Sequence, residues 1–260
     1  MSWSNVLQSY ARMKDPEKEL PKGVMLNCNK STLTIFDGYE KAKYHFLVLL
    51  AQIARDPFPL AESSQKIASS QLDSLSTLLK SPHKLQVLKA LERQANEVKE
   101  MIQDEMLKEY GWIWDVNIGF HANESMKHVH LHVISNDMLS DRLKNKKHWN
   151  SFHPRLGFFL HLSDAISGIE SETFTLKSPS HYEALLKSDL KSPYPPYSKT
   201  FKNLPELKRW IQEEWEKRGR EAKRVSKEKE GNEKKRIVEE TEEGDGESGK
   251  GEGKDKKQKV

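Results

Sequence analysis

The pattern of apolar and polar positions predicts four strands. Residues 33–36 (LTIF) and 45–50 (HFLVLL) are short apolar runs, and the Asp37–Gly38 pair after the first run is typical of a turn. Residues 114–120 and 128–135 alternate apolar with polar positions and are joined by a short polar segment. This spacing predicts an antiparallel pair of strands.

Apolar residues at three- and four-residue spacing predict three helices. The first contains Trp3, Leu7 and Tyr10, and the third is a charged helix in residues 204–230. The longest is predicted to begin at Ser81–Pro82, with serine as the cap and proline in the first turn, and to stop at Gly111. Its apolar stripe consists of Leu88, Leu91, Ala95, Val98 and Ile102. Together the elements predict an α+β fold in which helices pack on an antiparallel sheet.

The composition predicts a charged C-terminal tail and excludes several classes of protein. The chain has 260 residues, 35% hydrophobic and 32% charged, with a net charge of +4. Apolar residues nearly vanish in residues 219–260, so we expect a disordered charged tail there. Cys28 is the sole cysteine, which excludes an internal disulfide and a four-cysteine zinc site. We expect no membrane partner and a cytosolic or nuclear protein, because the chain shows no long apolar run and no signal-peptide core.

Three histidines occupy alternate positions in the fourth predicted strand. His128, His130 and His132 therefore share one face, predicted to line an accessible surface or cleft, and the apolar residues between them face the core. Three imidazoles can bind zinc in an open catalytic site. The neighbouring residues Lys127 and Lys147 are basic, which disfavours a cation and favours phosphate.

These residues resemble a known superfamily. The stretch HVHLHVI, residues 128–134, is similar to the His-φ-His-φ-His-φ-φ motif of the histidine-triad (HIT) superfamily, where φ is apolar. KAKYHFLVLL resembles the strand of that superfamily that carries a further histidine, here His45. HANESMKHVHLHVIS followed by LKNKKHWNSF resembles the DNA-repair branch, the aprataxin family. MSWSNVLQSYARMKDPEK resembles the helix of that branch whose aromatic residue, here Trp3, wedges against the base at a DNA end.

The resemblance implies roles for individual residues. His130 is the implied nucleophile, and the implied supporting catalytic residues are His128, His132, His45 and Ser125. The residues implied to bind the nucleotide are Asp37, Phe36, Lys41 and Met126. Those implied to bind DNA are Trp3, Lys144, Lys147 and His148.

The implied reaction removes AMP from a DNA 5′ end left by abortive ligation. It passes through an adenylyl-histidine on His130, needs no metal, and restores a 5′-phosphate for single-strand break repair. The implied partners are DNA with a 5′-AMP end or nick, the AMP or GMP product and other repair proteins, and we expect a nuclear monomer. Three alternatives stay open: a HIT hydrolase of dinucleoside polyphosphates or adenosine phosphoramidates, a non-catalytic binder of nicked DNA, and a metal-dependent enzyme using the three histidines.

The same resemblance predicts three regions. Residues 1–165 form a HIT domain with an N-terminal helix and a helical insert at about residues 56–110. Residues 166–218 resemble the family's zinc finger without its ligands, and residues 219–260 form the tail. Ser192 and Pro195 stand where a Cys-x-x-Cys is expected, and Trp210 and Glu214 stand where two histidines are expected. Because these side chains cannot together hold zinc, no zinc is expected.

Overall fold

The computed structural model describes residues 3–51, 58–59 and 66–244. The chain divides into two compact units, Met1–Trp215 and Glu216–Val260. Among the described residues, every helix is either too short or too polar to cross a bilayer.

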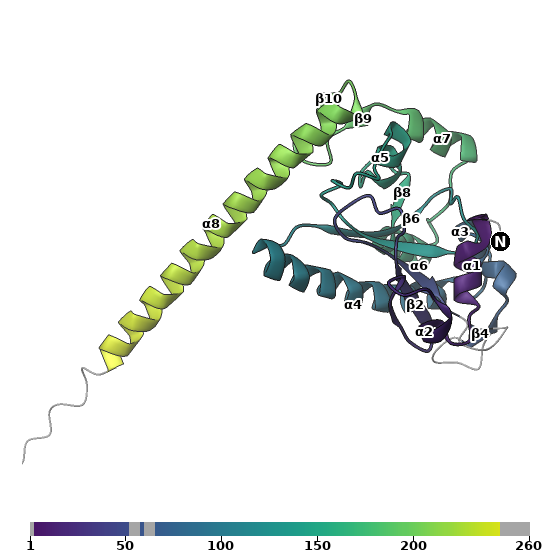
Figure 1. The fold of residues 1–260 in the computed structure, drawn as a ribbon, viewed down its shortest axis with the longest axis horizontal. Coiled ribbons are helices and arrows are strands. Elements are labelled where there is room, and N and C mark those ends of the chain that lie inside the picture. Colours follow the sequence, from purple (N-terminus) through teal and green to yellow (C-terminus); the bar gives the residue numbers. More distant parts are fainter. Residues whose placement is uncertain (1–2, 52–57, 60–65, 245–260) are drawn as a thin grey trace, which may run out of the picture. The chain divides into compact units, whose positions relative to one another are not determined.

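A six-stranded antiparallel sheet forms the centre of the first unit (Figure 1). In spatial order its strands are β1 (Met25–Cys28), β2 (Thr32–Phe36), β3 (His45–Leu50), β7 (His130–Ser135), β6 (Val116–His121) and β8 (Phe159–His161). Every residue of the two central strands, β3 and β7, is buried. The α+β fold, the four predicted strands and the antiparallel pairing of β6 with β7 are thereby confirmed.

Helices and two small strand pairs surround this sheet. The helical elements are η1 (Trp3–Asn5), α1 (Val6–Ala11), α2 (Pro16–Glu19), η2 (Ser69–Leu72), α3 (Leu75–Leu78), α4 (Lys84–Tyr110), α5 (Lys146–Phe152), α6 (Leu162–Glu170), α7 (Pro179–Lys187) and α8 (Leu204–Gly244). The small pairs are β4 (Phe58–Pro59) with β5 (Lys66–Ile67), and β9 (Leu190–Lys191) with β10 (Thr200–Phe201).

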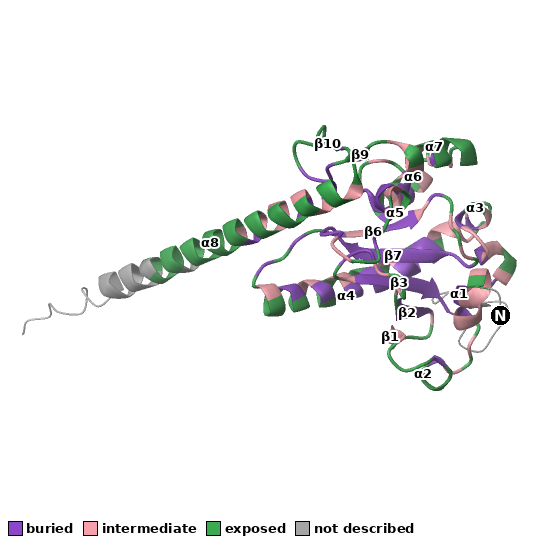
Figure 2. Ribbon diagram, turned by 45° about the horizontal axis from the view of Figure 1, so that its top comes forward, coloured by how far each residue is buried: buried purple, intermediate pink, exposed green. Residues whose placement is uncertain are grey.

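Helix α4 covers one face of the sheet (Figure 2). All five residues of its predicted apolar stripe are buried, and Gly111 ends the helix with a left-handed φ of 70°. The predicted start was wrong, because His83 rather than Ser81 caps the helix. The Ser81 hydroxyl instead accepts a hydrogen bond from the His83 amide and closes a turn before the helix.

The opposite face of the sheet carries two apolar clusters with the histidines between them. One cluster joins α1 to the sheet through Leu7, Leu47 and Leu49. The other joins Ile134 of β7 to Phe152 of α5. The sheet face bearing the histidines is therefore enclosed by α1 on one side and α5 on the other.

The C-terminal module is held by hydrogen bonds and apolar packing. The hydroxyl of Ser192 donates to the Tyr194 carbonyl (2.6 Å) and accepts from the Tyr194 amide (3.0 Å). The Tyr194 hydroxyl donates to the Asn136 carbonyl beside the sheet (2.7 Å). Leu207 and Ile211 of α8 are fully buried in the same cluster as Phe152 of α5. These contacts lie where the family resemblance implied a zinc site.

Two boundaries differ from those read from the sequence. The predicted boundary at residues 165–166 falls inside α6, which contacts β6 and β8, so the HIT domain and the C-terminal module share one compact unit. Residues 219–244 continue α8, where composition predicted disorder. Ion pairs between Arg224 and both Glu221 and Glu228 support this helix without a core. Residues 245–260 lie outside the described residues.

Candidate active site

His130 and His132 lie at the middle of the sheet. On β3, His130 is opposite Leu49 and His132 is opposite Leu47. Directly opposed residues of an antiparallel pair share a face, so both imidazoles lie on the face enclosed by α1 and α5. Both residues are buried, with 7% of His130 exposed. Of the two alternatives predicted for this face, an accessible surface or a cleft, the packed helices on both sides of β7 exclude the open surface.

His128 differs from the prediction in both conformation and orientation. It precedes β7 and has a left-handed φ of 82°, so strand alternation does not apply to it. Its amide donates to the Asp73 carbonyl (3.0 Å), and its ring Nε2 donates to the Leu50 carbonyl (2.9 Å). His128 thus anchors the chain that leads into the strand.

The carbonyl of His128 fixes the proton on His130. His130 Nδ1 lies 2.8 Å from this carbonyl oxygen, which can only accept, so Nδ1 carries the hydrogen. The lone pair of the neutral imidazole is then on Nε2. Burial lowers the pKa of His130, so the ring is neutral at pH 7. These features suit a nucleophile.

His45 and His132 form a hydrogen-bonded pair whose protons are also fixed. The Lys41 amide donates to His45 Nδ1 (3.2 Å), which leaves the His45 proton on Nε2. That nitrogen lies 3.0 Å from His132 Nδ1 and 3.4 Å from Asp37 Oδ2. His132 therefore carries its proton on Nε2. Burial lowers the pKa of His45 to about 4, and the pKa of His132 well below its usual value.

His121, at the end of β6, is a site residue that the sequence reading missed. Its ring lies beside that of His132, with 4.5 Å between the ring centroids. Nε2 of His121 and Nε2 of His132 are both buried and have no hydrogen-bond partner among the described residues. A phosphate oxygen would satisfy the Nε2–H of His132. The pairing of Gly119 with His132 signals this position, because residues 119 and 121 share the face of His132.

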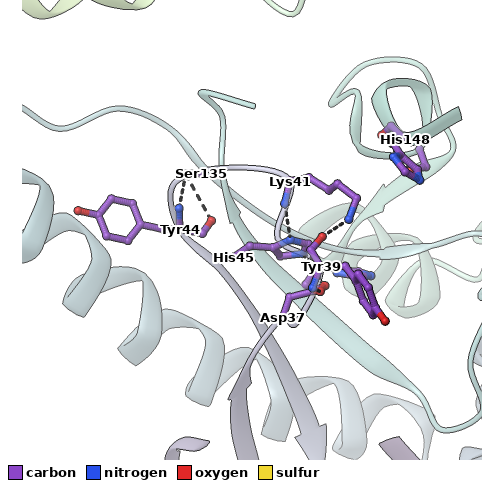
Figure 3. Close-up of polar contacts among 9 residues, drawn as sticks. Asp37, Tyr39, Lys41, Tyr44, His45, Ser135 and His148 are labelled. Carbon is purple, nitrogen blue, oxygen red and sulfur yellow. Dashed lines mark hydrogen bonds and ion pairs between the residues drawn. The ribbon is translucent and has the colours of Figure 1, made fainter. Parts of the chain in front are cut away.

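Asp37, Lys41 and His45 gather at the turn between β2 and β3, as Figure 3 shows. The Lys41 ammonium group is largely buried and bonds the Tyr39 carbonyl. His148 of α5 lies on the same side, and its pKa is lowered by partial burial and by the charge of Lys41. The Lys144 amide donates to its Nδ1 (3.1 Å), and the side-chain nitrogen of Asn145 lies 3.4 Å from its Nε2. Lys144 and Lys147 are exposed near it on the chain.

The remaining predicted residues flank a groove of about 510 Å³. Ser4, Ser125, Met126 and Lys127 contribute to its wall. The Lys127 amide donates to the Ser4 carbonyl (2.8 Å), which ties the turn carrying Trp3 to the loop before His128. The side chain of Trp3 is exposed (54%). Met126 packs against the cluster that contains Leu7.

Phe36 lies on the other face of the sheet. It pairs with Phe46, and their rings are 5.0 Å apart on the sheet face opposite the histidines. It lines a groove with Met101 of α4, and Asp37 and His45 also line this groove. The implied contact of Phe36 with a nucleotide stays a prediction, with strand alternation directing its side chain into this groove and away from the face of His130.

A cation is the other possible occupant of this site. Asp37, His45 and His132 each offer a ligand atom, and the three atoms lie within 4.8 Å of one another. Binding a metal there would break the His45–His132 hydrogen bond. The cationic Lys41 lies beside the same group. The donor set therefore suits an anion held by N–H groups better than a metal.

Comparison with known proteins identifies relatives. Residues 4–148 match the family model described as "Scavenger mRNA decapping enzyme C-term binding". The chain is 36% identical over 170 residues to aprataxin of Danio rerio, covering 65% of this chain and 41% of that protein. It is 33% identical over 215 residues to aprataxin of Gallus gallus, covering 83% of this chain and 56% of that protein. The chain thus spans about half the length of these curated relatives.

Solved structures share the fold. The crystal structure of the aprataxin ortholog Hnt3 in complex with DNA matches with a TM-score of 0.61 at 24% identity, covering 85% of this chain and 98% of that one. Hnt3 from Schizosaccharomyces pombe matches with a TM-score of 0.58 at 24% identity, covering 81% and 92%.

Proposed function

Because the chain belongs to the family of the scavenger mRNA decapping enzyme C-terminal domain, a HIT-like family, and its relatives include aprataxins, we propose that it is a DNA 5′-adenylate hydrolase. The observation that carries this proposal is the arrangement of His130. Within the part of the chain that the structure describes, its Nε2 lone pair has no partner, and neither has the buried Nε2–H of His132 beside it.

In the first step, His130 Nε2 attacks the α-phosphorus of the adenylate. A nitrogen–phosphorus bond forms and the bond from phosphorus to the bridging oxygen breaks, so that DNA leaves with a 5′-phosphate. Water then cleaves the nitrogen–phosphorus bond, releases AMP and restores neutral His130. A phosphate leaving group needs little protonation when donors surround it, so the mechanism requires no metal.

The surrounding residues divide the remaining work. The Nε2–H of His132 donates to an α-phosphate oxygen, and His45 maintains the tautomer that makes this possible. Asp37 faces the ribose and Lys41 the phosphates. Ser125 lines the groove through which the leaving group extends. Burial keeps these histidines neutral, so they act as directed dipoles.

DNA is the proposed substrate because several features extend past the nucleotide. Exposed Trp3 offers a ring for a terminal base, and His148 with Lys144 and Lys147 offers donors for the terminal phosphate. We place the enzyme in the nucleus as a monomer that acts at nicks with other repair proteins.

The test is release of AMP from a nicked duplex carrying a 5′-adenylated end, in EDTA. We expect release by the wild type and by His181→Ala, an exposed-histidine control, and a loss of at least about 10³-fold for His130→Ala. If the wild type cleaves an adenosine phosphoramidate but leaves the DNA intact, the nucleophile stands and the DNA assignment falls. Activity abolished by EDTA alone would show a metal-dependent reaction.

A further inference from the structure

The part of α8 in the second unit carries a stripe of basic residues. Between residues 220 and 234 the chain has six basic and four acidic residues. The net charge of this segment is therefore small, and the positions of the charges around the helix decide whether one side is basic. At 3.6 residues a turn, one side of the helix, within about 60° of arc, holds four basic residues over about 21 Å. The four residues of this basic stripe are Arg220, Lys223, Lys227 and Lys234, and all are exposed.

The acidic residues of this region are partly neutralised beside the stripe. Glu221 and Glu228 both bind Arg224, at 2.6 and 2.7 Å. In contrast, none of the carboxylates whose side chains the structure describes lies within ion-pair distance of Lys223, Lys227 or Lys234. Arg220 approaches Glu216 at 3.9 Å, the long end of an ion pair. The stripe therefore keeps a positive charge along its length.

The rest of this helix argues against a membrane as partner. A helix that lies on a bilayer needs an apolar face opposite its basic one. Here the opposite side holds Ala222, Ser226 and Lys229, with Val225 alone as a large apolar residue. Figure 2 shows exposed residues around the helix in this region. A linear row of cations without an apolar face fits a linear row of anions.

We propose that the basic stripe binds the phosphate backbone of duplex DNA. Its length of about 21 Å corresponds to about six base-pair steps of 3.4 Å. The choice of DNA among polyanions rests on the proposed function. The stripe lies in the second unit, whereas the histidines lie in the first. It therefore adds affinity for DNA as a second binding module on the same chain.

Two charge-matched variants of the full chain test this proposal. The stripe variant carries Lys223→Ala, Lys227→Ala and Lys234→Ala. The control variant carries Arg224→Ala, Lys229→Ala and Arg236→Ala, which remove three positive charges outside the stripe. Alanine favours helix, and circular dichroism of both variants checks that α8 is retained.

The measurement is the salt dependence of binding to a nicked duplex without an adenylate. Each phosphate contact contributes about 0.9 to the slope of log K against log salt, so we expect the stripe variant to lose about 2.7 from the slope. The control variant should lose less than about 1. Equal losses in both variants would overturn the proposal, since net charge alone would then explain binding. An unchanged slope in the stripe variant would overturn it as well.

Hydrolysis assays separate this proposal from the proposed function. On adenylated DNA we expect KM of the stripe variant to be about 10-fold higher than that of the wild type, with kcat unchanged. A fall in kcat alone would contradict the proposal that the stripe binds DNA. If the wild type fails to deadenylate DNA but the slopes still differ as expected, the stripe stands and the proposed function falls. If the wild type deadenylates DNA but the stripe and control variants lose equal amounts of slope, the proposed function is supported and the proposal for the stripe is wrong.

Discussion

His128 and His130 are two residues apart, yet their rings have different partners. The left-handed φ of His128 turns its own ring toward Leu50 while its carbonyl meets His130 Nδ1. Such a conformation in a non-glycine residue costs about 1 kcal/mol or more and persists only when surrounding bonds hold it. Two hydrogen bonds supply that support, one from the His128 amide to the Asp73 carbonyl and one from the His128 ring to the Leu50 carbonyl. His128 therefore positions His130, the proposed nucleophile.

His45 gives a prediction about proton placement. In His45→Asn the donor to His132 Nδ1 is displaced, so His132 no longer has a fixed proton on Nε2. We expect kcat on adenylated DNA to fall by about 10²-fold with little change in KM. The wild type and variant should differ in the acid limb of their pH–rate profiles. A change in KM alone would show that His45 only binds substrate.

The buried histidines predict acid sensitivity. Burial lowers the pKa values of both His45 and His128 to about 4, from an ordinary 6.5. The unfolded chain takes up protons first as pH falls, so stability present above pH 6.5 is lost between pH 6.5 and about 4. The loss is roughly 3 kcal/mol for each group. Urea denaturation at several pH values should show it, and His45→Asn should reduce the slope. A flat profile over this range would contradict the burial of neutral imidazoles.

At the scale of elements, α5 connects the site to the C-terminal module. His148 faces the nucleotide side, whereas its neighbour Trp149 is fully buried and donates to the Lys191 carbonyl of β9 (3.1 Å). Asn150 Nδ2 lies within 3.2 Å of the carbonyls of Leu185, Leu186 and Ser188 at the end of α7. Helix α5, with seven residues, thus contributes side chains both to the candidate site and to the packing of the C-terminal module.

Asn150→Ala should loosen the end of α7. Its removal leaves buried carbonyls without a donor, so we expect the free energy of unfolding to fall by about 1–3 kcal/mol. The activity of His130 on a small adenosine phosphoramidate should remain. Thermal unfolding compared with Ser151→Ala, whose hydroxyl bonds the local His148 carbonyl, measures the effect. Equal Tm values for the two variants would show that the bonds to α7 do not stabilise the fold.

The β9–β10 module predicts metal-independent stability. Ser192 and Tyr194 bond each other and the sheet where zinc ligands would stand in a finger. Excess EDTA should therefore leave Tm unchanged, whereas structural zinc would supply folding energy that a chelator removes. Ser192→Ala should lower stability by about 1–3 kcal/mol, because its buried backbone partners lose a bond. A fall in Tm with EDTA would reveal a metal.

At the scale of the whole molecule, chemistry and the basic stripe belong to separate compact units. The aromatic rings of Trp112, Trp114 and Trp215 pack together, so the first turns of α8 belong to the unit that holds the histidines. The later turns have charged side chains and ion pairs. Loss of the later turns should therefore spare the core.

Deletion of residues 220–260 is the corresponding prediction. We expect Tm and kcat on a small adenosine phosphoramidate to match the full chain, because the apolar clusters and histidines are retained. Affinity for plain nicked duplex should fall by about 10-fold or more, since phosphate contacts dominate such binding. Calorimetry and binding titrations measure both. A marked loss of Tm would show that the tail stabilises the first unit.

The sequence by itself determined the four central strands, most of the helices and the candidate nucleophile. Apolar alternation and helical spacing are local signals, and the His-φ-His-φ-His-φ-φ motif lies within one short stretch. Trp3, Asp37 and His148 became candidate site residues in the same way, through local resemblance.

Tertiary structure alone decided which nitrogen of His45, His130 and His132 carries the proton, and brought His121 to the site. His45 and His132 are 87 residues apart and meet through the register of β3 with β7. Register and burial depend on contacts between distant strands and on the helices that cover them, which no local pattern encodes. For the same reason, only the folded chain showed that Phe36 faces away from the histidines and that His128 leaves the strand.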